Sequence, residues 1–423
     1  MGTRAYSSDL STAARLSRFE KAMESLYGGF ADIQEPEKWT PPPNSGGHRG
    51  RYLWTDAFGV INFLTLYQEH SKIASAAGSA AASGSTPGSG RASATATGEN
   101  TSTTSNTADK YLTLARRLVD TVHDVLGRTR DGKARLPGAS DETPLGGGLR
   151  IGKLDELGVD GDGQYHHYLT IWMFALNRLS LATGDPTYNR QAITLAKAIH
   201  PRFFVNRTST RPRMVWKMSM DLSIALVSSE GNLDPIDGYV VYRLLQASAM
   251  EMNDSTVGGL DEEIADYKRV MERKGEHFVS ADPLDLERNG RRGWQRDVFN
   301  KYVVLPPPAE LYGIATEPYE LFEMDRYLAR SIKYRLAFRE FGTSLGIGCH
   351  YDKSSDKERA ADVRKYSDSI IESWEPYMAQ SLKDEGVLTA DDLRPITRVM
   401  YSSALIPGAF RTGYLGPEPK TIP

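Results

Sequence analysis

Cysteine is nearly absent from this sequence, because Cys349 is the only one among 423 residues. A single thiol excludes an internal disulfide framework and any zinc module built on two or more cysteine ligands. Long apolar runs are also missing, and none approaches the roughly 18 to 20 residues that span a bilayer. The first six residues lack the apolar region of a signal peptide. We therefore expect a cytoplasmic protein with no membrane partner.

An excess of one charge is also absent. Lys and Arg number 51 against 54 Asp and Glu, which leaves a net charge of −3 and no general attraction to nucleic acid. Phosphate-binding glycine motifs and kinase signatures are missing, so we predict no cofactor. Apolar residues make up 40% of the chain, which is enough for a large core and excludes global disorder.

One segment differs in composition from the rest. Residues 71–108 are almost entirely Ala, Ser, Thr and Gly and contain no aromatic residue. Such a stretch buries too little apolar area to offset its ordering entropy. Helical patterns stop at its start and resume at its end, so we predict a flexible insertion within one domain that covers residues 1–423. A linker between two domains is the competing interpretation.

The remaining sequence alternates between two kinds of predicted helix. One kind is apolar nearly all round and the next carries a single apolar stripe, as three successive pairs show: 52–70 with 111–126, 164–183 with 188–200, and 236–252 with 260–278. Further helices are predicted near 294–304, 322–341, 357–382 and 395–410. No segment has the period-two pattern of a strand. The pattern indicates an all-α fold with two concentric layers, an (α/α) toroid of helical hairpins; a helix-pair solenoid is the alternative.

Three features resemble the six-hairpin glycosidase superfamily, which includes sugar epimerases and unsaturated-uronyl hydrolases. They are the segment Tyr52-Leu53-Trp54-Thr55-Asp56, the connector Leu181-Ala182-Thr183-Gly184-Asp185-Pro186-Thr187-Tyr188, and the alternation itself. The resemblance covers most of the chain from Tyr52 onward. It implies an (α/α)6 barrel with its active site at one end, in the loops that lead into the inner helices.

The loops before the buried helices are rich in Gly, acidic and aromatic residues. They lie at 46–56, 160–168 and 229–239, whereas the return connection at 183–187 is short. In an array of alternating hairpins, all loops of the first kind lie at the same end. We therefore expect them to form one mouth, where free N–H groups at helix N-termini favour anions.

The carboxylates of this mouth are the first candidates for catalysis, because glycosidic chemistry commonly needs one acid and one ionised carboxylate. Asp56, Asp162 and Asp237 are predicted to act with His166, and we expect the side chains of Asp56, His166 and Asp237 to converge on one pocket. The alternative is structural. Asp162, Asp234 and Asp237 suit helix N-caps, and Asp56 could pair with Arg51.

Adjacent histidines project about 100 degrees apart on a helix, so His166 and His167 cannot both face the pore. One is predicted to be the acid/base and the other a packing or substrate-binding residue. Neither has a histidine four residues away, so we predict no metal site. Arg243, on a buried helix, should pair with Asp237 or Glu230. The full set of predicted substrate-binding residues is Trp54, His167, Trp216, Lys217, Glu230, Asp234, Tyr239 and Arg243.

These patterns favour a carbohydrate-active enzyme, most simply a glycoside hydrolase that uses paired carboxylates on a small-molecule or oligosaccharide substrate. A sugar epimerase would instead place histidines at the centre. An isoprenoid dehydratase or cyclase would need a drier, aromatic-lined site. A non-catalytic helical scaffold would lack convergent ionisable groups and would show a large apolar patch elsewhere. The sequence leaves the oligomeric state open.

Overall fold

The computed structural model describes residues 11–43, 46–83, 99–158, 160–231, 234–274, 327–350, 357–383 and 393–419. This part of the chain is mostly helical, with only two-residue strands, so the predicted all-α class is confirmed. The helix predicted near 294–304 lies outside the described residues. Of the one predicted for 322–341, residues 322–326 also lie outside the described part; from residue 327 onward, two short 3-10 turns precede an α-helix that begins at Ala337.

One row of helices lies in the interior. Its members contact one another in the order α10, α12, α2, α4 and α6. Most of their side chains are buried on every side, as the apolar patterns of 52–70, 164–183 and 236–252 predicted. Their bounds are Ala337–His350 for α10, Arg394–Leu405 for α12, Leu53–Ser83 for α2, His166–Thr183 for α4 and Asp234–Glu251 for α6.

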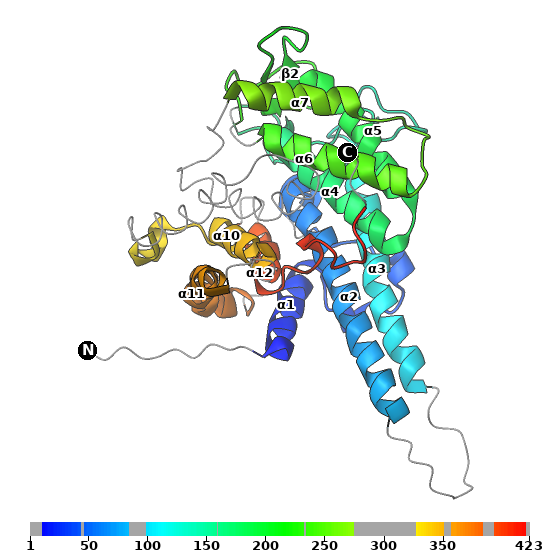
Figure 1. Ribbon diagram of the computed structural model, residues 1–423, viewed down its shortest axis with the longest axis vertical. Coiled ribbons are helices and arrows are strands. Elements are labelled where there is room, and N and C mark those ends of the chain that lie inside the picture. Colours follow the sequence, from blue (N-terminus) through cyan, green and yellow to red (C-terminus); the bar gives the residue numbers. More distant parts are fainter. Residues whose placement is uncertain are drawn as a thin grey trace, which may run out of the picture.

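A second row covers the first, and each of its helices packs mainly on one inner helix. Thus α11 packs on α10, α1 on α12, α3 on α2, α5 on α4 and α7 on α6 (Figure 1). The outer bounds are Lys357–Ser381 for α11, Thr12–Tyr27 for α1, Glu99–Leu126 for α3, Pro186–Phe203 for α5 and Asp261–Lys274 for α7. The fold therefore has two helical layers, and its first helix packs on its last.

Polar contacts help to join α2, in the N-terminal part of the chain, to α12, in its C-terminal part. Asn62 of α2 donates from Nδ2 to the carbonyl of Val399 at 3.0 Å and accepts from the Ser403 hydroxyl at 2.9 Å. Asn62 and Ser403 are fully buried, so each hydrogen bond avoids the penalty of an unsatisfied polar group. These bonds fix how α12 lies against α2.

The segment predicted as a flexible insertion needs correction at both of its ends. Helix α2 continues to Ser83 and α3 begins at Glu99, and the two run side by side (Figure 1). Alanine has the highest helix propensity, and the hydroxyls of Ser71, Ser75 and Ser79 donate to carbonyls four residues earlier. Composition alone was therefore misleading at 71–83 and 99–108. Residues 84–98 lie outside the described part.

The connector between α4 and α5 follows its sequence signals. Gly184 ends α4 with φ of 69°, a left-handed conformation that glycine adopts without strain. The Asp185 side chain then accepts from the backbone N–H of Thr187 at 2.9 Å, and Pro186 occupies the first turn of α5. This tight turn makes α4 and α5 an antiparallel hairpin.

Two short ladders hold the loop between α5 and α6. Strand β1 (Gln164–Tyr165) pairs antiparallel with β4 (Lys217–Met218), with Tyr165 opposite Lys217. Strand β2 (Phe204–Val205) pairs with β3 (Arg213–Met214) in the same sense. Because β1 leads directly into α4, the first ladder places this loop beside the start of that helix.

Within the described residues, no helix combines the length and apolarity needed to cross a membrane.

Candidate functional site

Two histidines and one aspartate meet where α4 and α6 begin. His166 and His167 are the first residues of α4, and Asp234 is the first residue of α6. Oδ1 of Asp234 lies 3.3 Å from Nδ1 of His166 and 3.7 Å from Nδ1 of His167. Asp234 is fully buried, and its charge is favoured at a helix N-terminus. Both imidazole rings therefore lie beside the same carboxylate.

His166 belongs to the interior. Its ring packs against Phe203 of α5 and Tyr267 of α7, with ring centroids 5.4 and 5.8 Å away, and the residue is fully buried. Its Nε2 atom lies 2.7 Å from the Tyr267 hydroxyl. The hydrogen bond of Nε2 and the packing of Phe203 and Tyr267 hold the ring in place, whereas Nδ1 lies near the Asp234 carboxylate without a hydrogen bond among the described residues.

His167 reaches the surface, with 17% of its side chain exposed. The ring of Tyr165 is stacked on it at 5.6 Å, and Tyr168 and Trp54 approach it edge-on at 4.7 and 5.9 Å. The ring centroid of Trp216 lies 5.3 Å from that of Tyr165, and Trp216 is only partly buried. The exposed edge of this imidazole is thus framed by aromatic rings. As adjacent positions on a helix required, the two histidines face different surroundings.

Polar contacts hold the aromatic frame, by which we mean the rings of Trp54, Tyr165, Tyr168 and Trp216 around His167. The hydroxyls of Tyr52 and Tyr168 lie 2.6 Å apart and join the start of α2 to α4. Trp216 donates from Nε1 to the Ser229 hydroxyl at 2.9 Å. Lys217 donates from Nζ to the carbonyl of Gly161 at 2.9 Å. These contacts set the frame before any ligand binds.

Lys217 is buried behind the frame, with Nζ lying 5.2 Å from the centre of the Tyr165 ring. Burial lowers the pKa of Lys217, and the nearby positive charge of Lys153 lowers it further. Its role in the structure is to support Tyr165 from the side opposite the solvent.

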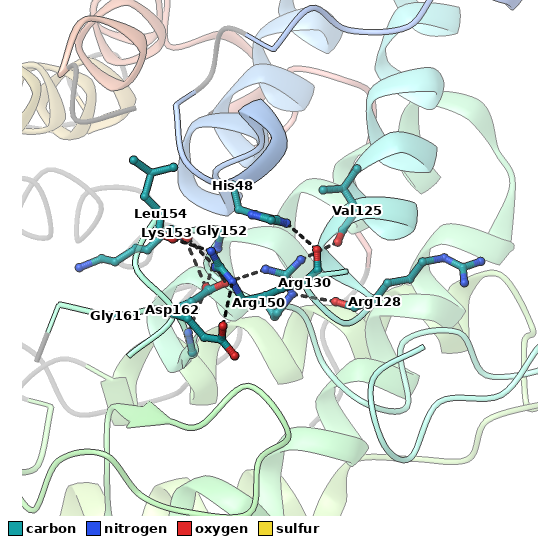
Figure 2. Close-up of polar contacts among 12 residues, drawn as sticks. His48, Val125, Arg128, Arg130, Arg150, Gly152, Lys153, Leu154, Gly161 and Asp162 are labelled. Atoms are coloured by element: carbon teal, nitrogen blue, oxygen red, sulfur yellow. Dashed lines mark hydrogen bonds and ion pairs between the residues drawn. The ribbon is translucent and has the colours of Figure 1, made fainter. Parts of the chain in front are cut away.

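Asp162 is the centre of a different arrangement, shown in Figure 2. Oδ2 of this buried carboxylate accepts from Arg150 at 2.6 Å and from Arg130 at 2.8 Å. Oδ1 accepts from the backbone N–H groups of Gly152 at 2.9 Å and Gly163 at 3.0 Å. Asp162 neither caps a helix nor contacts the histidines through these bonds. It joins two loops, so its predicted catalytic role loses support.

Asp56 is also tied to an arginine. Its Oδ1 atom lies 3.4 Å from Nη1 of Arg51 and accepts from the Tyr27 hydroxyl at 3.3 Å. The pairing with Arg51 was one of the two sequence interpretations, and the structure confirms it. Burial, and secondly the charge of Asp56, raises the pKa of Tyr27 well above its usual range. Asp56 thus links the first turn of α2 to Tyr27 of α1 and to Arg51.

The expected partners of Arg243 have other contacts. Glu230 forms a two-pronged ion pair with Arg273 of α7, at 2.7 and 2.8 Å. Arg243 lies over the ring of Tyr239 at 5.5 Å and donates to its hydroxyl at 3.2 Å. Asp237 is buried in the first turn of α6. Burial raises the pKa of Tyr267 well above its usual range, and the nearby charge of Asp237 adds to this.

Several residues of this site were not singled out from sequence. Tyr52, Tyr165 and Tyr168 lay in the loops expected at the mouth, so their position could have marked them. Tyr267 is in a charged outer helix, where its place on the apolar stripe suggests only packing. Among the described residues, no group of three or more His, Cys, Asp or Glu side chains is arranged to hold a metal ion.

Comparisons with known proteins do not identify a family. No protein-family model matches this chain, and no curated protein matches it. The function must therefore be argued from the geometry of the site, and the resemblance to six-hairpin glycosidases remains an expectation.

Proposed function

We propose that the chain is a carbohydrate-active enzyme on a closed (α/α)6 toroid, with His167 as general acid/base and Asp234 as the group that orients it. The two helical layers support the toroid, as does the packing of α1 and α2 on α12, which joins the chain ends. The starts of α4 and α6 supply both proposed catalytic groups. This is the end of the inner helices where the superfamily resemblance places an active site.

One observation carries the proposal: a partly exposed imidazole has a buried carboxylate behind it and aromatic rings around it. Imidazole is the side chain best suited to gain and lose a proton near neutral pH. A carboxylate 3.7 Å from Nδ1 of His167 favours the orientation in which Nε2 faces a substrate. The exposed parts of Tyr168 and Trp216 offer flat apolar surfaces on which a sugar ring can stack.

Proton transfer of the epimerase or isomerase kind fits these groups better than hydrolysis by the carboxylates first predicted. The charges of Asp56 and Asp162 are balanced by arginines, whose protons are retained at any functional pH. Asp234, in contrast, lies beside two histidines.

Hydrolysis is the second candidate, and a specific observation favours it. Asp237 lies three residues after Asp234 in the first turn of α6, so the two carboxylates share one face of the helix. A glycosidase on this scaffold would use these two groups, with Asp56 and Asp162 in structural roles.

The test is turnover of a panel of monosaccharides and oligosaccharides in D2O, followed by proton NMR. An epimerase replaces a carbon-bound hydrogen with deuterium, whereas a hydrolase produces new reducing ends. We expect H167N to lower turnover by about 100-fold or more, because general acid/base catalysis contributes on that scale. Circular dichroism and thermal melting should remain those of the parent chain.

The matched control is H70N. His70 also pairs with a carboxylate, Glu20 at 2.7 Å, and has a similar exposed fraction of 20%. Turnover should be unchanged in this variant. Full activity of H167N, or no turnover of any sugar in the panel, would refute the proposal. Loss of hydrolysis in D237N, with new reducing ends in the parent, would favour the second candidate.

A further inference from the structure

Exposed aliphatic side chains gather on two loops beside the candidate site. Nine large apolar residues are exposed in the described part of the chain, and five of them lie singly on other elements. The remaining four are Leu154, Leu157, Ile224 and Leu226, which we call the apolar rim. Scattered apolar residues on a surface need no explanation, whereas a group of them indicates a binding region.

The first loop is a hairpin that runs from Lys217 to Leu226 and extends the ladder of β1 and β4. The Leu226 N–H donates to the carbonyl of Lys217 at 3.0 Å, so these two residues lie opposite one another, as Lys217 and Tyr165 do. Opposite residues share a face of a sheet, and so do alternate residues of a strand. Ile224, Leu226 and Tyr165 therefore lie on one face. Because the Tyr165 ring is stacked on His167, this face is continuous with the aromatic frame.

Polar side chains hold the hairpin in one conformation. The Ser219 hydroxyl accepts from the N–H groups of Ser223 and Ile224 at 3.1 and 3.0 Å. Oδ1 of Asp221 accepts from the N–H and the hydroxyl of Ser223 at 3.1 and 2.7 Å. Leu222 has φ of 61°, which is strained for a leucine, yet its side chain is buried in the core. Such strain persists only where the surrounding contacts impose it, so the exposed position of Ile224 is built into the hairpin.

The second loop carries Leu154 and Leu157 and is fixed to the Asp162 cluster. Arg130 donates to the carbonyl of Leu154, and the Asp162 N–H donates to the carbonyl of Asp155 at 2.7 Å. The Leu154 side chain points away from Asp162 (Figure 2), and 44% of this residue is exposed. Like the hairpin, this loop has a fixed shape and leaves its leucines outside the core.

The two loops meet at Gly161 and Gly163. A Cβ atom on Gly161 would lie 2.5 Å from the backbone of Leu157, so that loop packs directly on this glycine. A Cβ atom on Gly163 would lie 3.5 Å from Cδ1 of Leu226. The two glycines are only two positions apart in the chain. The leucines of the second loop and the aliphatic residues of the hairpin are therefore neighbours.

The charges beside the apolar rim are mainly negative, which narrows the choice of ligand. Lys153 and Lys217 are the only basic residues of the two loops; Lys217 is buried, and Lys153 pairs with Asp160 at 3.4 Å. The exposed carboxylates of these loops are Asp155, Glu156, Asp160 and Asp221. Anionic lipid surfaces attract clusters of Lys and Arg and would be repelled here. An uncharged apolar group of a small molecule meets no such repulsion.

We infer that the apolar rim binds an uncharged apolar substituent of the substrate, so that the substrate class is a sugar that carries an alkyl or aryl group. This inference rests on the proposed function, because it takes His167 as the reacting group. A sugar stacked on the aromatic frame can extend its substituent past Tyr165 to Leu226 and Ile224. Since both loops are already fixed, little conformational entropy is lost when they bind this group.

Calorimetric titration of the full chain with paired probes tests this without turnover. Each pair consists of the methyl and the octyl glycoside of one sugar, used below the concentration at which the octyl compound forms micelles. We expect the octyl member to bind at least about 10-fold more tightly, because each buried methylene favours binding. Its heat-capacity change should also be more negative, which marks the burial of apolar surface.

The double variant I224S/L226S removes half of the apolar rim and should reduce the affinity ratio to about 3-fold or less. L157S is a second variant in case the double variant does not fold, since Leu157 is 82% exposed, and it should lower the ratio in the same direction. I73S and M250S are the matched controls. Ile73 and Met250 are 48% and 57% exposed on α2 and α6, and these variants should keep the ratio of the parent chain.

Several outcomes would overturn the inference. Equal affinities within each pair would do so, as would a loss in the controls as large as that in the double variant. Binding of the parent chain to neutral phosphatidylcholine vesicles that I224S/L226S abolishes, with no preference for octyl glycosides, would assign the rim to a membrane. A dimer in analytical ultracentrifugation that dissociates in the double variant would assign it to a second copy of the chain.

The two proposals can fail separately. H167N should keep the preference for octyl glycosides, because His167 is not part of the apolar rim. That preference, lost in I224S/L226S but accompanied by no sugar turnover, would remove the proposed function and leave the rim as a binding site. Turnover that depends on His167, with equal affinities within each pair, would remove the present inference alone.

Discussion

Asp162 and Asp234 are both buried carboxylates beside the start of α4, yet their partners differ in kind. Asp162 accepts from two guanidinium groups and from backbone N–H groups. Asp234 faces two imidazoles, one buried and one partly exposed. The comparison shows that burial and charge alone do not distinguish a structural carboxylate from a chemically useful one.

The decisive property is whether the partner can give up its proton. Arginine stays charged at every functional pH, so a carboxylate that faces two arginines holds a permanent ion pair and fixes the loops around it. Histidine gains and loses a proton near neutrality, so a carboxylate that faces histidines can support proton transfer. On this basis Asp162 belongs to the fold and Asp234 to the proposed chemistry.

The largest expected effect is a loss of stability, and it tests whether Asp162 has a structural role. D162N removes the charge that balances Arg150 and Arg130, and breaking a buried ion pair costs about 3 to 5 kcal/mol. Urea unfolding at pH 7 should show that loss. D234N should cost only about 1 to 2 kcal/mol, because its partners can become neutral.

D160N is the control for this experiment, since the Asp160 side chain is 90% exposed and forms an ion pair with Lys153 at 3.4 Å. Its effect should stay within about 0.5 kcal/mol. Equal losses in D162N and D234N would contradict the distinction between the two aspartates.

A second prediction concerns a buried histidine that has no carboxylate partner in the contacts described, His123, and the way in which stability depends on pH. Trp172 donates from Nε1 to Nε2 of His123 at 3.1 Å, so that nitrogen must be unprotonated. Burial lowers the pKa of His123 to about 3. The unfolded chain, with a histidine pKa of about 6.5, takes up this proton first as the pH falls. Stability should therefore decrease by about 2 kcal/mol between pH 6.5 and pH 5 through this residue alone.

Urea unfolding of the parent chain and of H123Q at several pH values measures that contribution. Glutamine can still accept from Trp172 but does not titrate, so the difference between the two proteins should change with pH by the stated amount. Parallel stability curves for the two proteins would show that His123 is not held neutral.

Much of the fold could be predicted from periodicity, because a helix buried on all sides and a helix with one apolar stripe differ in sequence. The alternation predicted the two layers. The polar loops before the buried helices indicated the end of those helices at which His167 and Asp234 lie. The extension of α2 to Ser83 was missed, because a segment rich in alanine and serine looks like a linker by composition, whereas alanine has the highest helix propensity.

The partners within the site could not be predicted in the same way. Asp162 and Asp234 look alike in sequence, and only long-range folding brings Arg130 and Arg150 to one and the histidines to the other. Tyr267 is about 100 residues from His166 in the chain, and a stripe of apolar positions does not reveal which hydroxyl meets which ring. The sequence therefore does not predict which polar side chains of separate segments pair with one another.

The smallest expected effect concerns a third buried carboxylate, which tests how far the rule from Asp162 extends. Glu418 accepts from Arg178 of α4 at 2.7 and 3.0 Å, and both side chains are nearly fully buried. Asp162 balances two arginines, whereas Glu418 pairs with Arg178, which also donates to the side-chain oxygen of its neighbour Asn177 at 2.7 and 3.2 Å. Part of the guanidinium therefore stays satisfied when the carboxylate is lost.

We expect E418Q to cost about 1 to 2 kcal/mol in urea unfolding, less than D162N, because one arginine rather than two loses its carboxylate, and Arg178 keeps its hydrogen bonds to Asn177. E262Q is the matched control, since that glutamate also pairs with an arginine but its side chain is 87% exposed, and it should change stability by less than about 0.5 kcal/mol. A loss in E418Q as large as that in D162N would mean that the number of arginines paired with the carboxylate does not set the cost. Burial of the ion pair alone would then determine the loss of stability.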